Sequence, residues 1–123
     1  MKNCYCGSGK FFKECCEPLI EGIEKAPTAE ALMRSRYSAY CVVNVDYLLK
    51  TTHPKTRKMF SRESINEFAT HNQWIKLEII NSSTNSVTFK AFYINDSLQA
   101  QSHYERSTFQ QEDGVWYYVK GEY

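Results

Sequence analysis

Four of the five cysteines lie within the first 16 residues and form the pattern C-x-C-x8-C-C, made by Cys4, Cys6, Cys15 and Cys16. Zinc binds four ligands in a tetrahedron, and thiolates are among its preferred ligands. The loop Gly7-Ser8-Gly9 between the two pairs lets the backbone fold tightly around an ion. The pattern therefore predicts a structural Zn²⁺ site whose four positions are all held by protein, which leaves none open for a substrate.

Three other interpretations of these cysteines stay open: unpaired thiols on a frayed terminus, disulfides, and a redox-active thiol pair. The N-terminus has no apolar export signal, so we expect a cytoplasmic location, where disulfides are disfavoured. Redox pairs typically have C-x-x-C spacing, which this segment lacks. For a bound Zn²⁺, we expect Lys10 and Lys13 to offset part of the negative charge of the four thiolates.

A second group of candidate residues centres on Arg36. The segment 29–43 has no glycine or proline, and on a helical wheel Arg36 lies in the middle of its apolar arc. A buried guanidinium needs a counter-ion or hydrogen bonds, and we expect Glu105 of a later strand to be the partner. The pair either anchors helix to sheet or forms the polar part of a ligand pocket, unless Arg36 extends to water. The candidate pocket residues are Arg36, Tyr37, Tyr40, His53, Trp74, Glu105 and Trp116.

His53 precedes Pro54, so it is expected to end a helix. It could act as a general acid or base near neutral pH, or it could cap the helix before it. The sequence contains no phosphate-binding glycine loop after a strand and no nucleophile elbow. We therefore predict no catalytic residue from a motif.

Composition restricts the class of protein. A chain of 123 residues is one domain with room for a small appended module. The net charge of +1 provides no field that would attract nucleic acid or an anionic membrane surface. No apolar run approaches the roughly 20 residues that span a bilayer.

The elements that must position these residues change along the chain from helical to strand-like patterns. Helices are expected over 29–43, 46–51 and 62–70, with Thr28, Asp46 and Ser61 as caps. Alternation predicts strands over 74–80, 87–94, 98–111 and 115–120, joined by hairpins. This order favours an α+β fold with three helices on one curved four-stranded antiparallel sheet. We expect a knuckle over 1–17, a connector over 18–27 and the main domain over 28–123.

The cysteine segment resembles a known motif. Residues 4–16 are similar to the SEC-C motif, named for the C-terminus of the secretion ATPase, and differ mainly in having Tyr5 where proline is usual. The resemblance implies zinc binding by the four cysteines and a docking surface for another protein.

The rest of the chain resembles the YchJ-like (UPF0225) family through the segments Leu32–Tyr40, Tyr47–Pro54, Glu105–Phe109 and Trp116–Gly121. That family joins a SEC-C knuckle to a cone-shaped domain of the nuclear transport factor 2 (NTF2)-like, or cystatin-like, fold. No reaction is established for it. We expect a non-enzymatic zinc protein that docks a partner protein through the knuckle. The alternative is a small-molecule binder, or an isomerase- or dehydratase-like enzyme, that uses the cone cavity.

Overall fold

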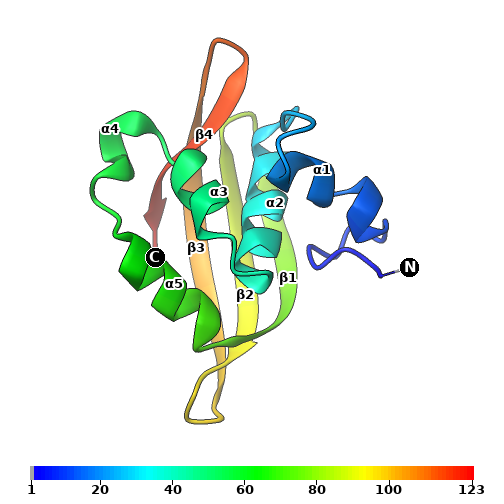
Figure 1. Cartoon of the computed structure of the whole chain (residues 1–123), viewed down its shortest axis with the longest axis vertical. Coiled ribbons are helices and arrows are strands. Elements are labelled where there is room, and N and C mark those ends of the chain that lie inside the picture. Colours follow the sequence, from blue (N-terminus) through cyan, green and yellow to red (C-terminus); the bar gives the residue numbers. More distant parts are fainter. Residues whose placement is uncertain (1) are drawn as a thin grey trace.

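The computed structural model describes residues 2–123 and contains one four-stranded antiparallel sheet with helices on one face (Figure 1). The strands follow the chain order β1-β2-β3-β4, with β1 Gln73–Ser82, β2 Ser86–Ile94, β3 Ala100–Glu112 and β4 Val115–Glu122. The helices are the 3₁₀ turn η1 Phe12–Glu14 and α1 Glu17–Ile20, α2 Ala29–Cys41, α3 Val45–Lys50, α4 Pro54–Arg57 and α5 Arg62–Thr70. This arrangement confirms the expected α+β class.

Two of the expected helix caps are present. The Thr28 hydroxyl accepts the Ala31 N–H at 3.0 Å, and the Ser61 hydroxyl accepts the Ser64 N–H at 2.9 Å. The Asp46 cap was wrong, because α3 begins at Val45 and its cap is the Asn44 side chain.

Two short helices were not expected from the sequence. Helix α1 occupies the beginning of the segment 18–27 that was expected to be a connector, and α4 follows directly after His53. Both have a proline in the first turn, Pro18 in α1 and Pro54 in α4, and the fixed φ of proline suits that position. Single turns of this kind leave no periodic pattern in the sequence.

An irregularity in β1 determines which side chains reach the interior. The pairing with β2 shifts between Trp74 and Lys76, so Ile75 is an extra residue and is left exposed. Trp74 and Leu77 therefore lie on the same face of the sheet, although strict alternation placed them on opposite faces. This bulge turns the indole of Trp74 toward the helices.

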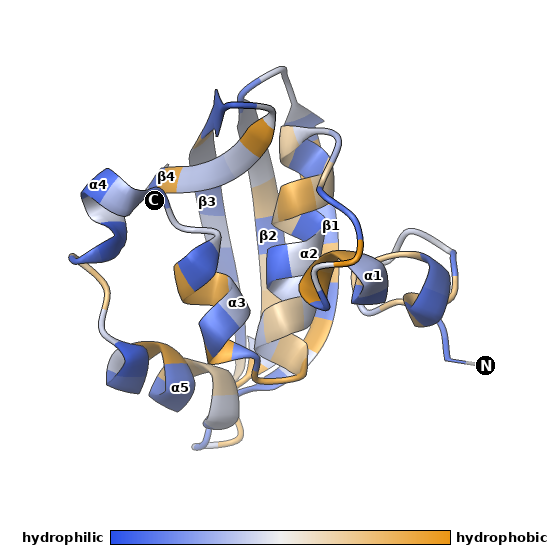
Figure 2. Ribbon diagram, turned by 45° about the horizontal axis from the view of Figure 1, so that its top comes forward, coloured by the Kyte–Doolittle hydropathy of each residue, from blue (hydrophilic) through white to orange (hydrophobic). Residues whose placement is uncertain are grey.

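Helix α2 is covered on two sides, by the sheet and by the N-terminal segment 2–17, which we call the knuckle (Figure 1). Its residues alternate between hydrophobic and hydrophilic along its length (Figure 2). Ser38 lies opposite the apolar arc on a helical wheel, yet it is fully buried, since Cys4 Sγ of the knuckle lies 3.7 Å from its Oγ. None of the helices within residues 2–123 is long and apolar enough to cross a membrane.

Candidate metal centre and ligand cavity

The knuckle is a tight hairpin that gathers the cysteines. Asn3 and Phe11 form an antiparallel bridge, and the Cys4 N–H donates to the Lys10 carbonyl at 2.8 Å. Gly7 and Gly9 close the turn with φ values of 78° and 85°, a left-handed conformation that glycine adopts without strain. The turn η1 then brings Cys15 and Cys16 back toward the first pair.

The four sulfur atoms fit one tetrahedral ion. The Sγ atoms of Cys4, Cys6, Cys15 and Cys16 all lie within 4.8 Å of one another. Zn–S bonds of about 2.3 Å in a tetrahedron place the sulfurs about 3.8 Å apart. The Cys6–Cys15 and Cys15–Cys16 separations are 3.7 Å and 4.0 Å. All four cysteines are free of disulfides, so the cluster could hold a metal ion.

The sulfurs also interact strongly with one another. Side-chain hydrogen bonds from Cys16 and Cys4 hold the pKa of the Cys6 thiol far below its ordinary value. The same Cys4 and Cys6 contacts, with burial, raise the pKa of Cys16 well above its ordinary value. Thiols that share their protons with one thiolate form an anionic nucleus that a divalent cation can complete.

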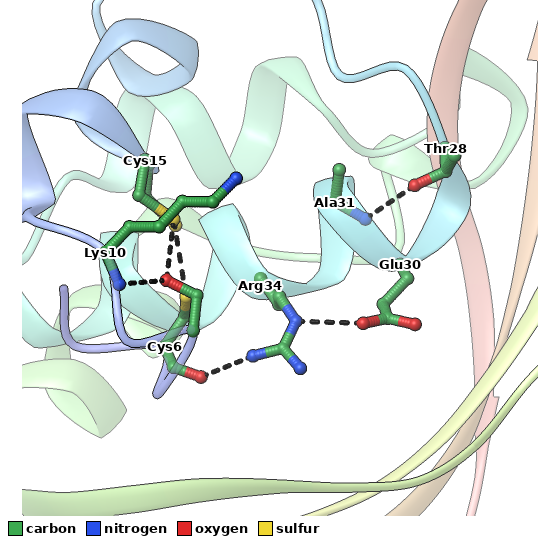
Figure 3. Close-up of polar contacts among 9 residues, drawn as sticks. Cys6, Lys10, Cys15, Thr28, Glu30, Ala31 and Arg34 are labelled. Atoms are coloured by element: carbon green, nitrogen blue, oxygen red, sulfur yellow. Dashed lines mark hydrogen bonds and ion pairs between the residues drawn. The ribbon is translucent and has the colours of Figure 1, made fainter.

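Arg34 of α2 connects this cluster to the main domain. Its Nη1 donates to the Cys6 carbonyl at 2.7 Å, and its Nε pairs with Glu30 at 3.0 Å, as Figure 3 shows. Sequence reasoning missed this role because Arg34 falls on the side of the helix opposite the apolar arc. Its spacing of four residues from Glu30 was the only local signal. The guanidinium places a positive charge beside the thiolates, a function we had expected Lys10 and Lys13 to serve.

A second feature is a cavity of about 330 Å³ bounded by α2, α5 and all four strands. Five of the seven candidate pocket residues line it: Arg36, Tyr37, Tyr40, Trp74 and Glu105. Further lining side chains that we had not assigned to a pocket are Met33, Phe60, Phe68, Phe89, Ala91, His103, Ser107, Tyr118 and Tyr123. The alternation along β3 had put His103 and Ser107 on the face of Glu105. The remaining lining residues could not be assigned from the sequence, because their place in the cavity depends on how the helices and strands pack together.

Arg36 does not pair with Glu105, which corrects our expectation. The Arg36 Nη1 donates instead to the Leu48 carbonyl at 2.9 Å and to the hydroxyls of Thr51 and Thr52 at 2.7 and 3.4 Å. The guanidinium carbon also lies 4.4 Å from the centre of the Tyr118 ring. The end of α3 thus provides the oxygen acceptors that a partner on the sheet was expected to provide.

Glu105 has its own set of donors. Its carboxylate lies 2.8 Å from His103 Nε2 and accepts the hydroxyls of Ser107 at 2.5 Å and Tyr118 at 3.1 Å. Burial alone would raise the pKa of Glu105, but these hydrogen bonds outweigh it and hold that pKa below its ordinary value. Gly121 leaves the space for this carboxylate, because a Cβ there would collide with it.

His53 and Trp116 do not line the cavity. His53 stands before α4, where its Nδ1 accepts the Lys55 N–H at 3.1 Å, so it caps the helix that follows and not the one before. Its Nε2 lies 3.0 Å from Glu112 but out of line for a hydrogen bond. Trp116 pairs with Gln111 near the β3–β4 turn, far along the hairpin from Glu105. Arg36, His53 and Glu105, all three among the candidate pocket residues, are therefore not brought together in one site.

Comparison with known proteins gives a consistent picture. Residues 28–121 match the family model for the YchJ middle NTF2-like domain. A UPF0225 protein of Geobacter sulfurreducens is 41% identical over 96% of this chain and 77% of its own length. A UPF0225 protein of Streptomyces coelicolor is 39% identical over 98% of this chain and 94% of its own length.

Two solved structures are similar over nearly the whole chain. The solution structure of a SEC-C motif containing protein from Rhodopseudomonas palustris has a TM-score of 0.90 and 36% identity, and covers 98% of both chains. The crystal structure of a SEC-C motif containing protein from Psychrobacter arcticus has a TM-score of 0.80 and 26% identity, and covers 98% of this chain and 81% of that one. From the domain match, the relatives and the cysteine cluster, we conclude that the chain belongs to the YchJ-like (UPF0225) family of SEC-C motif proteins.

Proposed function

We propose that this protein binds a small molecule in the cavity between α2 and the sheet, and that a structural Zn²⁺ ion fixes the knuckle against α2. The observation that carries the proposal is the cavity itself, about 330 Å³ with aromatic walls, a buried guanidinium and a buried carboxylate that do not pair with each other. Cavities of a few hundred Å³ with apolar walls and a few polar groups are typical ligand sites.

The segments that carry the family resemblance support this choice. Arg36, Glu105 and Tyr118, which come from three of them, line the cavity, and the fourth, Tyr47–Pro54, supplies the hydroxyl acceptors of Arg36. A protein that only needed a packed core would be expected to fill this space with aliphatic side chains.

In this proposal the zinc is structural. The donor set of four thiolates leaves no open position, and the knuckle is too short to build a core of its own. The ion would hold Cys4, Cys6 and Cys16 in the interior they share with α2. A reducing compartment such as the cytoplasm would keep the thiols available for it.

The test is a fragment titration followed by two-dimensional ¹⁵N NMR, with two variants of β2. Ala91→Phe adds a ring on the cavity face, whereas Thr88→Phe adds the same ring on the opposite face of the strand. We expect fragments to shift resonances around the cavity in the wild type and in Thr88→Phe, but not in Ala91→Phe. A wild-type cavity that no fragment perturbs would contradict the proposal.

We propose protein docking through the knuckle as a second function, favoured by one observation. Phe11 at its outer surface is 41% exposed, and Lys2, Lys10 and Lys13 around it are exposed as well. An aromatic side chain among lysines suits an acidic partner segment. Phe11→Ser leaves the cysteines in place, so it should abolish cross-linking to a partner while the bound metal per chain stays unchanged. Equal cross-linking by the wild type and by Phe11→Ser would exclude this surface as the docking site.

A further inference from the structure

Arg36 has unused hydrogen-bond donors inside the cavity. A guanidinium carries five N–H groups in a rigid fork, and the contacts to Leu48, Thr51 and Thr52 all involve Nη1. Within residues 2–123, Nε and Nη2 have no hydrogen-bond acceptor, and no carboxylate lies within 4.0 Å of the group. Arg36 is nevertheless only 7% exposed. A buried cation without a counter-ion is costly, and it is normally paired.

Glu105 is not available as that counter-ion. Three donors, from His103, Ser107 and Tyr118, already occupy its carboxylate. Tyr118 separates the two charges, because its ring lies under the Arg36 guanidinium while its hydroxyl donates to Glu105. The cavity thus contains a carboxylate that accepts three hydrogen bonds and a guanidinium that, among the described residues, lacks a counter-ion and acceptors for Nε and Nη2.

The same cavity is also lined by aromatic rings, which pack edge-on or tilted against one another. The rings of Tyr40, Phe68 and Trp74 contact one another with centroid separations of 5.9, 5.6 and 5.3 Å. Phe89 and Ala91 of β2 form another part of the lining. At roughly 30 Å³ for each water-sized group, a volume of about 330 Å³ holds about eleven such groups. A planar molecule with a ring and one polar substituent matches this size and shape.

Resting on the proposed function, we propose that the ligand is a small planar organic acid whose carboxylate binds Nε and Nη2 of Arg36. Arginine binds a carboxylate through two parallel N–H···O bonds, a geometry that a primary amide or an alcohol cannot reproduce with the same strength. The ring of the acid lies against Tyr40, Phe68 and Trp74. The bound carboxylate supplies the missing counter-ion of Arg36. Glu105 keeps its hydrogen bonds to His103 and to the hydroxyls of Ser107 and Tyr118.

The experiment uses four probes of similar shape: benzoate, benzamide, benzyl alcohol and benzylamine. Each is titrated into the full-length metal-loaded protein at low salt and followed by ¹⁵N NMR, including the arginine Nε–H signals. Charge-assisted bidentate pairing should make benzoate bind about tenfold or more tightly than benzamide. Benzoate, but not benzamide, should shift the Arg36 Nε–H signal in the wild type, which gives a readout that needs no variant.

Variants at position 36 complete the test. Arg36→Lys keeps the charge without the fork and should lose most of the preference for benzoate, and Arg36→Met should lose all of it while still binding benzamide. Four probes that bind equally well in the cavity would overturn the ligand class and leave cavity binding intact. Tightest binding of benzylamine would also overturn it, and would assign recognition to Glu105. Absence of binding by every probe would refute this inference, and the fragment titration would then decide whether the cavity binds any small molecule.

Discussion

Replacement of one cysteine of the cluster gives a sharp test of the proposed metal site. Cys16 is 1% exposed and its Sγ lies 4.0 Å from that of Cys15. A structural zinc site with four thiolates binds with an apparent free energy of about 10–16 kcal/mol near pH 7. One ligand in four therefore accounts for roughly 2.5–4 kcal/mol, which corresponds to a loss of affinity of about 60- to 700-fold in Cys16→Ser.

Cys41→Ser is the matched control. Cys41 lies at the end of α2 and belongs to no metal cluster within residues 2–123. Burial raises the pKa of its thiol to about 12, and its replacement removes none of the four clustered sulfurs. The same serine substitution there should leave metal affinity unchanged, and any loss of stability would come from packing alone.

The assay is competition for Zn²⁺ against a chromophoric chelator, combined with urea unfolding of the same protein with and without excess chelator. When the free metal concentration is about 1,000 times the Kd of the site, metal binding stabilises the folded state by about 4.1 kcal/mol. The wild type and Cys41→Ser should lose stability of that order on chelation, whereas Cys16→Ser should lose little. Equal affinity of the two serine variants, or wild-type protein purified under reducing conditions without stoichiometric metal, would refute the reasoning.

Three further results are expected. In a double-mutant cycle of unfolding free energies, Arg36→Met and Thr51→Val should couple by about 1 kcal/mol or more because the side chains share a hydrogen bond, whereas Arg36→Met and Glu105→Gln should be closer to additive. Gly121→Ala should destabilise the protein by about 1–3 kcal/mol, since its Cβ meets the Glu105 side chain, and most of this loss should disappear in Gly121→Ala/Glu105→Ala. The folded-state pKa of Glu105 is below its ordinary value of 4.5, so its carboxylate stabilises the fold above that pH, and this stabilisation is lost as pH falls through the folded-state pKa. In a plot of the urea midpoint against pH, Glu105→Gln should therefore flatten the decline on the acid side. An unchanged decline would exclude the hydrogen bonds from His103, Ser107 and Tyr118 as its cause.

Local features of the chain determined the classes of element and their order. Thr28 and Ser61 begin helices because their hydroxyls can accept an N–H of the first turn wherever the helix lies. The hairpin β2–β3 keeps strict alternation, so the inward set that includes Glu105 and Ser107 could be read from spacing. The four cysteines within 13 positions are local in the same sense, because a short loop alone brings them together.

Contacts between distant segments decided the rest. Arg36 had to be buried, but its acceptors became the carbonyl and hydroxyls at the end of α3 when α3 packed against α2. Trp74 turned inward through a bulge opposite β2, and a one-residue slip in a strand reverses every side chain beyond it. Ser38 lost its contact with water and Arg34 became partly buried because the knuckle covers α2. A helical wheel assumes instead that one side of the helix stays exposed.

The sequence by itself thus determined what depends on spacing: the sulfur cluster, the capped helices, the hairpin sheet and a guanidinium that must be buried. Only the tertiary structure decided the partner of that guanidinium and the composition of the cavity. The physical reason is that a buried polar group accepts any partner that satisfies its hydrogen bonds. Which partner is present depends on how the helices pack on the sheet, and local sequence does not encode that packing.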